Sequence, residues 1–285
     1  MIDPDYLYTF IDNAIKEDVG DGDHTSIACI PSMKEGKAQL IVKEKGVLAG
    51  VEVAQQVFHR FDPFLKTAVL MHDSARIFPG DVVLTVEGRM ISILQCERLV
   101  LNIMQHMSGI ATQTSQYIEK LAGTSTKLLD TRKTTPGMRL IDKEAVRIGG
   151  GSNHRIGLFD MILIKDNHID FVGGIEKTID AVNQYLEKRG KMLKIGIEAR
   201  CLEDVERIVK HNKVHRIMFD NFDIETTRKA VKMVNGYHET ESSGNINLNN
   251  IRDYALCGVD FISVGALTHQ IKSLDMSLQA LQAVD

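Results

Sequence analysis

Cationic side chains gather in residues 130–168, and their placement points to a site for a small, strongly anionic molecule. The formal net charge of the whole chain is −4, so the cluster is a local feature. Two apolar runs, 127–129 and 161–164, end directly in polar and cationic residues, with Arg132 and Lys133 after the first and Lys165 after the second. Cations that follow buried strands in this way are candidates for ligand binding.

Between these two runs lies Gly149-Gly150-Gly151, where the backbone can approach a ligand closely. His154 and Arg155 follow and add to the cationic set. Lys143 and Arg147 belong to a helical stretch, and we expect both on its solvated face.

Six short apolar runs after Gly123 alternate with helical stretches, as the strands of parallel β/α units do. The runs are 126–129, 161–164, 193–197, 216–219, 237–240 and 261–264. Each is followed by charged, amide or small residues; the later runs contribute Glu198, Asp220, Ser243-Gly244 and Gly265-Ala266. In a β/α barrel the active site lies at the C-terminal ends of the strands, so these side chains are expected to meet at one edge.

The residue types suggest which part of a substrate each of them would bind. Guanidinium groups bind carboxylate or phosphate through two hydrogen bonds, and lysine acts as a point charge. Two carboxylates, Glu198 and Asp220, suit Mg²⁺, sugar hydroxyls or a cationic transition state. Glycine-containing turns after the last strands bind phosphate in many such barrels. A polycarboxylate joined to a sugar phosphate fits this set.

The first third of the chain mixes helices with strands. Apolar spacing predicts helices over 5–18 and 51–61, and alternation predicts a strand over 37–42. Residues 75–87 read as short strands around a turn at 78–81. This part is therefore expected to form a small α+β layer.

A long helical pattern over residues 92–121 follows, and Gly109 is a candidate break or kink in it. Arg98 interrupts its apolar character, and by itself reads as a surface or salt-bridged residue. The acidic stretch 20–26 lacks the ligand spacing of a calcium loop, so we expect a structural turn in which Asp23 binds nearby backbone amides.

Composition indicates an ordinary globular protein, with 44% hydrophobic and 25% charged residues in 285. The slightly acidic balance disfavours nucleic-acid binding, and no apolar run is long enough to span a membrane. Residues 1–5 do not resemble a secretory signal. The four cysteines are widely separated, which favours buried thiols in a reduced, cytoplasmic protein and disfavours zinc.

Several motifs, in order and over nearly the whole chain, resemble those of the quinolinate phosphoribosyltransferases, also called nicotinate-nucleotide pyrophosphorylases (carboxylating). They are E-D-V-G-D-G-D-H-T-S at 17–26, E-R-L-V-L-N at 97–102, D-T-R-K-T-T-P-G-M-R at 130–139, G-G-G-S-N-H-R at 149–155, I-L-I-K-D-N-H at 162–168, F-D-N-F at 219–222, E-S-S-G-N-I at 241–246 and S-V-G-A-L-T-H at 263–269. Any one of them is weak, but the combination at 130–168 is highly specific.

The resemblance implies transfer of phosphoribose from phosphoribosyl pyrophosphate to the nitrogen of quinolinate, giving nicotinate mononucleotide, pyrophosphate and CO₂ with Mg²⁺. It implies an N-terminal α+β sandwich-like domain, residues 1–112, followed by an incomplete (β/α) TIM-like barrel, residues 113–267. Whether C-terminal helices at 268–285 complete the first domain is left open.

The resemblance also assigns roles to individual residues. Those expected around the quinolinate carboxylates and phosphates are Arg132, Lys133, His154, Arg155 and Lys165. Glu198 and Asp220 would face the ribose and the metal, and with Lys133 and Lys165 they form the expected catalytic set. Ser243, Gly244, Gly265 and Ala266 would bind phosphate, with His269 close by. Arg98 would come from the neighbouring subunit of a homodimer or of a hexamer built as a trimer of dimers.

Two positions depart from the family pattern. Gly196 stands where relatives often have a second glutamate, and Asn245 where many have a second glycine. Two other functions remain open: a barrel lyase or aldolase with Lys165 as a Schiff-base amine, and a non-catalytic anion-binding relative.

Overall fold

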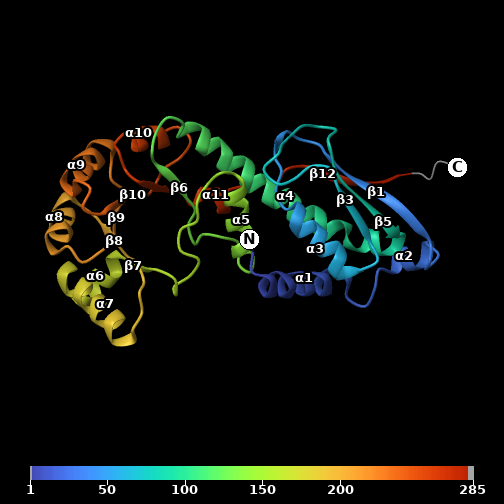
Figure 1. Cartoon of the computed structure of the whole chain (residues 1–285), viewed down its shortest axis with the longest axis horizontal. Helices are drawn as coiled ribbons and strands as arrows, with labels where there is room; N and C mark the ends of the chain where they lie inside the picture. The colour runs from blue at the N-terminus through green and yellow to red at the C-terminus, as the bar shows by residue number, and fades with distance from the viewer. Residues whose placement is uncertain (1, 282–285) are drawn as a thin grey trace. The chain divides into compact units, whose positions relative to one another are not determined.

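The computed structural model describes residues 2–281 and divides into two compact units (Figure 1). Unit 1 contains residues 1–115, 134–150 and 267–285, and unit 2 contains residues 116–133 and 151–266. The division near residue 115 lies close to the expected boundary at 112. The segment 134–150 differs from the expectation, because it belongs to the first unit although it lies inside the expected barrel domain.

The helices of unit 1 begin where the sequence offers caps. Helix α1 (Pro4–Val19) starts with a proline in its first turn, and the Asp3 carboxylate accepts a hydrogen bond from the Tyr6 amide. Asp23 lies in the expected turn and accepts a hydrogen bond from the Ser26 amide, which caps a short helix, α2 (His24–Cys29). Helix α3 (Val51–Phe61) has the predicted bounds.

Unit 1 contains an antiparallel sheet with the strand order β12-β1-β5-β3. Its strands are β1 (Glu35–Val42), β3 (Lys66–Val69), β5 (Val82–Arg89) and β12 (Met276–Leu281), and a separate small sheet pairs β2 (Gly46–Val47) with β4 (Arg76–Ile77). In β1, Ala38, Leu40 and Val42 are buried on one face.

Strand β12 corrects the expectation of C-terminal helices. Residues 276–281 pair antiparallel with β1, with Leu278 opposite Leu40. Their apolar residues alternate, and β1 offers an edge on which that alternation buries one face. The C-terminal segment therefore joins unit 1 as a strand; residues 282–285 of the predicted segment lie outside the described part.

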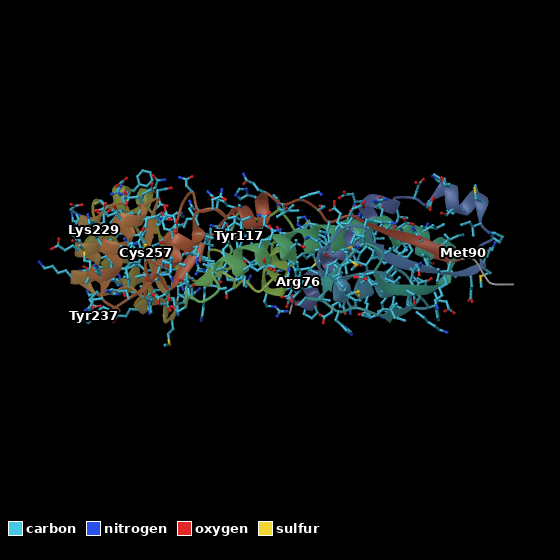
Figure 2. All side chains as sticks on the ribbon, turned by 90° about the horizontal axis from the view of Figure 1, so that it is seen from above. Arg76, Met90, Tyr117, Lys229, Tyr237 and Cys257 are labelled. Atoms are coloured by element: carbon cyan, nitrogen blue, oxygen red, sulfur yellow. The ribbon has the colours of Figure 1, made fainter. Side chains whose placement is uncertain are left out.

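Helix α4 (Met90–Lys120) is continuous, so the expected break at Gly109 is wrong. Figure 2 shows its side chains, among which Met90 and Tyr117 are labelled. At Gly109 the carbonyl group of Lys272 lies where a Cβ atom would be. The glycine thus permits close backbone approach inside unit 1.

Helix α5 (Arg139–Ile148) corrects the interpretation of Lys143 as a solvated residue, because Lys143 is only 2% exposed. Arg147 is on the surface as expected and pairs with Glu144 at 2.6 Å. The helix pattern identifies which residues share a face, but it does not show which of those faces is buried in the fold.

Unit 2 contains a six-stranded parallel sheet with the order β6-β11-β10-β9-β8-β7. The strands are β6 (Lys127–Leu129), β7 (Ile162–Ile164), β8 (Ile195–Ala199), β9 (Arg216–Asp220), β10 (Glu239–Ser243) and β11 (Phe261–Ser263). Within the described residues no strand ladder joins β6 to β7, and Leu129 of β6 instead forms an isolated bridge with Ser152, which lies before β7 in the chain. The sheet is therefore an incomplete barrel that is open between its first two strands.

Helices follow the strands β7 to β11 along the chain. They are α6 (Asp166–Val172), α7 (Ile175–Arg189), α8 (Leu202–His211), α9 (Ile224–Val234), α10 (Ile251–Ala255) and α11 (Ala266–His269). In Figure 1 helices α7, α8 and α9 cover the outer side of the strands. Each presents apolar residues inward, such as Ile179, Val205 and Ala230. All six predicted strands exist, and β8, β9 and β10 extend further than predicted, so Glu198, Asp220 and Ser243 lie within strands.

Across residues 2–281, no helix has both the length and the apolar character that a membrane crossing requires. All four cysteines are free thiols. Cys96 and Cys257 are buried as expected, whereas Cys29 and Cys201 are exposed, which corrects the expectation of burial for these two.

Candidate active site

The C-terminal edge of the sheet in unit 2 brings together most of the predicted site residues. Glu198 lies near the end of β8, Asp220 ends β9 and Ser243 ends β10, and these three strands are neighbours. Lys165 directly follows β7, which pairs with β8. Because the strands are parallel, all four side chains lie at the same edge of the sheet.

Lys165 and Glu198 form a close ion pair at this edge. The Lys165 Nζ atom lies 2.5 Å from Glu198 Oε1, and the lysine side chain is 46% exposed whereas the glutamate is 8% exposed. The lysine backbone is fixed as well, because its amide donates to His168 Nδ1 at the start of α6. The pair therefore presents an accessible ammonium above a shielded carboxylate.

The segment after β6 is tied to the segment that precedes β7. Asp130 is fully buried and accepts hydrogen bonds from Asn153 Nδ2 at 2.6 Å and from the His154 amide at 2.8 Å. Arg132 and Lys133, which follow Asp130, are exposed. Asp130 thus joins the two halves of the predicted cationic stretch across the open side of the barrel.

Arg155 is half-buried, and its guanidinium donates to the carbonyl of Met161 at 3.2 Å. Burial lowers the pKa of Arg155, and the positive charge of Arg132 lowers it further, while Asp160 and Glu198 act in the opposite direction. The two arginines therefore repel each other across a partly desolvated region. A bound anion would relieve that repulsion.

His154 lies beneath this surface. It is buried, its Nδ1 atom accepts a hydrogen bond of 2.7 Å from the Arg155 amide, and its Nε2 atom lies 3.4 Å from Glu241 Oε2. Glu241 also accepts a hydrogen bond from Arg216 Nη1 at 2.9 Å.

The motifs did not identify Arg216 and Glu241 as functional residues. A signal was present, because Arg216 is a charged residue that begins the predicted strand run 216–219, and Glu241 directly follows the run 237–240 and lies within β10. A buried charge needs a partner, and the pairing of β9 with β10 provides it.

Asparagines organise the loops beside Asp220. Asn221 Nδ2 donates to Asp220 Oδ2 at 3.1 Å, and the Asn221 amide donates to the Ser243 carbonyl at 2.8 Å. Asn245 Nδ2 donates to Asn221 Oδ1 at 3.1 Å, and Asn245 has φ 53°. Asn245 therefore adopts the left-handed conformation for which glycine is the usual residue, and adds a side-chain hydrogen bond.

Gly196, the second departure, lies in the buried strand β8. A Cβ atom there would lie 3.0 Å from Met161 Cε and 3.2 Å from Leu163 Cδ1. A larger side chain at this position would require both neighbours to move. This chain therefore fills with apolar side chains the space that a second glutamate would need.

The four remaining predicted residues divide between the two units. Gly265 follows β11 and Ala266 begins α11, so both lie at the same edge of the unit 2 sheet. His269 ends α11 and Arg98 lies on α4; both are exposed and belong to unit 1. Inside unit 2, the structure thus gathers the cationic stretch, the two carboxylates and the phosphate-type turns.

The carboxylates offer a limited metal site. Among residues 2–281, no group of three or more His, Cys, Asp or Glu side chains is arranged to hold a metal ion. Glu198 and Asp220 are oxygen donors on neighbouring strands, and Mg²⁺ is commonly held by one or two carboxylates together with substrate phosphates. The donor set fits an ion bound mainly through a phosphate ligand.

Comparison with known proteins covers nearly the whole chain. Residues 23–108 match the family model for the quinolinate phosphoribosyl transferase N-terminal domain, and residues 110–279 match the model for the C-terminal domain. Together the two matches include most of the strands and helices described above.

Individual relatives agree with the family models. The chain is 43% identical to quinolinate phosphoribosyltransferase [decarboxylating] 1b of Nicotiana tabacum, over 93% of this chain and 80% of that protein. It is 41% identical to the chloroplastic nicotinate-nucleotide pyrophosphorylase [carboxylating] of Arabidopsis thaliana, over 96% of this chain and 82% of that protein. The crystal structure of NadC from Streptococcus pyogenes superposes with a TM-score of 0.92 at 38% identity, covering 99% of each chain.

Proposed function

Because the chain belongs to the quinolinate phosphoribosyltransferase family, and so acts on quinolinate and phosphoribosyl pyrophosphate, we propose that the reaction takes place at the C-terminal edge of the unit 2 sheet. The enzyme transfers phosphoribose to quinolinate with decarboxylation, giving nicotinate mononucleotide, pyrophosphate and CO₂ for NAD biosynthesis. The family assignment replaces both the lyase and the non-catalytic alternative.

The observation that carries the site proposal is the Lys165–Glu198 pair beside Asp220, with Arg132 and Arg155 near the same edge. Cations suited to a dicarboxylate and carboxylates suited to a ribose are thereby placed side by side. Arg132, Lys133, Arg155 and Lys165 would bind the carboxylates of quinolinate and the phosphates. His154 would contribute from below this surface.

Ribose and its phosphates would lie toward the other strands. Positive charge develops at the anomeric carbon during transfer, so the fixed carboxylates of Glu198 and Asp220 would stabilise the transition state. Ser243, Gly244, Gly265 and Ala266 would bind phosphate, with His269 close by. Glu198 and Asp220 would also hold Mg²⁺, which when bound would neutralise charge on the departing pyrophosphate.

Decarboxylation needs little further chemistry from the protein. Once its nitrogen is alkylated, the pyridine ring is cationic and accepts the electron pair of the breaking carbon–carboxylate bond. Arg132, Arg155 and Lys165 would hold the dianion in place during this step. No covalent nucleophile is required.

Two further proposals concern the assembly of subunits and the location of the protein in the cell. Arg98 would be supplied by the neighbouring subunit of a homodimer or of a hexamer formed by three dimers. A cytoplasmic location follows from the sequence argument alone and stays a prediction.

The function is tested by incubating the purified protein with quinolinate, phosphoribosyl pyrophosphate and Mg²⁺ while measuring nicotinate mononucleotide and CO₂ together. Both products are expected in equal amounts. Arg132→Ala should lower kcat/KM for quinolinate by at least about 100-fold, because a group that orients the substrate is lost.

Lys229→Ala is the matched control, since Lys229 is an exposed cation on α9 whose partner is Glu225 (Figure 2). It should leave activity unchanged. Reaction of nicotinate in place of quinolinate would contradict the substrate assignment, and full activity of Arg132→Ala would contradict the proposed site.

A further inference from the structure

A buried group of charged residues lies under the cationic surface of unit 2 and has no place in the mechanism above. Glu241 on β10 is fully buried, and Arg216 on the neighbouring strand β9 is nearly so. Burying a charge costs several kcal/mol unless it is paired. The contact of Glu241 with His154 connects this group to the cationic surface.

Arg216 is the centre of the group. Its Nη1 atom donates to Glu241 at 2.9 Å, its Nη2 atom donates to Glu239 at 2.9 Å, and its guanidinium lies 3.9 Å from the centre of the Phe261 ring. Glu239 in turn accepts from Lys194 at 3.2 Å. The two cations balance the two carboxylates, so the group is neutral without any charge on His154.

The hydrogen bond at Nδ1 defines the tautomer of the His154 ring. Nδ1 accepts a hydrogen bond from the Arg155 amide at 2.7 Å, so it carries no proton. The remaining ring proton is then on Nε2, which lies 3.4 Å from the Glu241 carboxylate. A doubly protonated ring would place an N–H group against the Arg155 N–H group, which this geometry does not allow.

The Glu241 carboxylate is suited to face the Nε2–H group of His154. Burial raises its pKa, but hydrogen bonding by His154 and Ser263 and the positive charge of Arg216 lower the pKa below its ordinary value. The carboxylate is therefore ionised and accepts hydrogen bonds only. It cannot donate to His154 and thereby favour the other tautomer.

We propose that Glu241, held by Arg216, is a positioning residue that keeps His154 as the neutral Nε2–H tautomer and, through the His154 ring, fixes the backbone and guanidinium of Arg155. This inference rests on the proposed function, in which Arg155 binds a carboxylate of quinolinate. It gives His154 an indirect role instead of direct contact with the substrate. Phosphoribosyl pyrophosphate would be held mainly by the turns after β10 and β11 and by Glu198 and Asp220, none of which is positioned through the His154 ring.

The tautomer is tested on the wild-type enzyme by ¹⁵N NMR of the protein labelled at histidine ring nitrogens, with His154→Gln used to assign the His154 signals. The expected spectrum has a protonated Nε2 and an unprotonated Nδ1. Protonation of both nitrogens, or of Nδ1 alone, would overturn the proposal. This measurement does not depend on catalysis, so it distinguishes failure of the inference from failure of the proposed function.

The positioning role is tested by Glu241→Gln, with Glu239→Gln as the matched control. Both variants remove a carboxylate that binds Arg216, but only Glu241 faces His154. Glu241→Gln is expected to raise KM for quinolinate by about tenfold or more, because Arg155 is displaced, and to leave KM for phosphoribosyl pyrophosphate unchanged. Glu239→Gln should change neither value. Equal effects of Glu241→Gln on both substrates would indicate a merely structural role and overturn the proposal.

Combining Glu241→Gln with His154→Gln shows whether Glu241 acts through His154. If it does, the double variant should have a quinolinate KM no higher than that of the poorer single variant. Multiplication of the two effects would show independent action and would contradict the relay. Should Glu241→Gln fail to fold, the NMR result on the wild-type enzyme decides the proposal.

Discussion

Asn221 and Asn245 both have a left-handed backbone conformation, and they hold the loop after β10 next to Asp220. Asn221 has φ 57° and contacts the Asp220 carboxylate, the Ser243 carbonyl and the Asn245 amide group. Asparagine tolerates this backbone region better than other residues with a Cβ atom. Asn245 therefore keeps a glycine-like backbone conformation and adds a hydrogen bond.

Gly244, between Ser243 and Asn245, cannot be replaced in the same way. Its φ is 96°, and a Cβ atom at this position would collide with the Asn221 side chain. We expect Gly244→Ala to raise KM for phosphoribosyl pyrophosphate by about tenfold or more, because the loop and the Asp220 contact both shift. Steady-state kinetics with each substrate varied in turn would measure this.

The control for Gly244→Ala is Gly236→Ala. Gly236 also has a positive φ, 76°, but no atom lies within 4 Å of the position of an added Cβ. It should show a similar backbone penalty in stability without the change in KM. Equal kinetics for the two variants would argue against a specific role of the Gly244 loop.

Among the elements, α4 and the segment before β12 are joined by a close backbone approach. The Lys272 carbonyl occupies the space beside Gly109, and the Leu274 amide donates to the Gln105 carbonyl at 3.0 Å. Strand β12 then continues along β1. The glycine therefore helps to fix the C-terminal strand in unit 1.

Gly109→Ala is expected to destabilise the protein by about 1–3 kcal/mol, because the new methyl group meets rigid backbone instead of a flexible side chain. Alanine is otherwise the better helix former, so a destabilising result is specific to this contact. Urea unfolding would measure the difference. Gln116→Ala, an exposed change on the same helix, is the control, and a stabilised Gly109→Ala would contradict the account.

An ion pair connects helices α7 and α8 and provides a pH test. Arg207 Nη2 lies 2.5 Å from Glu176 Oε2, and hydrogen bonding to Arg207 lowers the pKa of Glu176 from 4.5 to about 2. Because the pKa is lower in the folded state, the stabilisation is present above the unfolded pKa and is lost as pH falls toward about 2.

Glu176→Gln should therefore lower the free energy of unfolding at neutral pH by at most about 1 kcal/mol, the range for exposed ion pairs. The difference from wild type should shrink as the pH is lowered through the acidic range in which the protein still folds. Denaturant unfolding across that range would measure it. Glu187→Gln, an exposed change on the same helix, is the control; a difference that grows with acidity would reverse the expected sign.

At the scale of the whole molecule, the proposal that the neighbouring subunit supplies Arg98 has a direct test. Arg98 lies in unit 1, whereas Lys165 lies in unit 2. Arg98→Ala and Lys165→Ala should each abolish most activity alone. If Arg98 is supplied by the neighbouring subunit, hybrids contain one site with both residues intact, and randomly mixed subunits regain about a quarter of wild-type activity.

Co-expression of the two variants with different affinity tags would provide the hybrid for assay. The control pairs Arg132→Ala with Lys165→Ala, since both residues lie in unit 2 and hybrids should recover no activity. Absence of recovery with Arg98→Ala would show that the arginine serves its own subunit or none.

Local sequence patterns determined much of this protein. Apolar spacing gave α3 its observed bounds, and each of the six apolar runs after Gly123 became a strand of unit 2. Those strands are parallel neighbours, so their polar ends meet at one edge, as the motifs predicted. The family and its reaction were also recognisable, because the motifs keep their order and spacing along nearly the whole chain.

Tertiary structure decided what depends on distant partners. Residues 276–281 form a strand because β1 offers an edge, Gly109 accommodates the Lys272 carbonyl within a continuous α4, and Lys143 is buried. The Glu241–His154 contact likewise requires two separate strands and a loop to meet. Periodicity reports which residues share a face, whereas burial and charge pairing depend on what packs against that face, and only the folded chain brings those partners together.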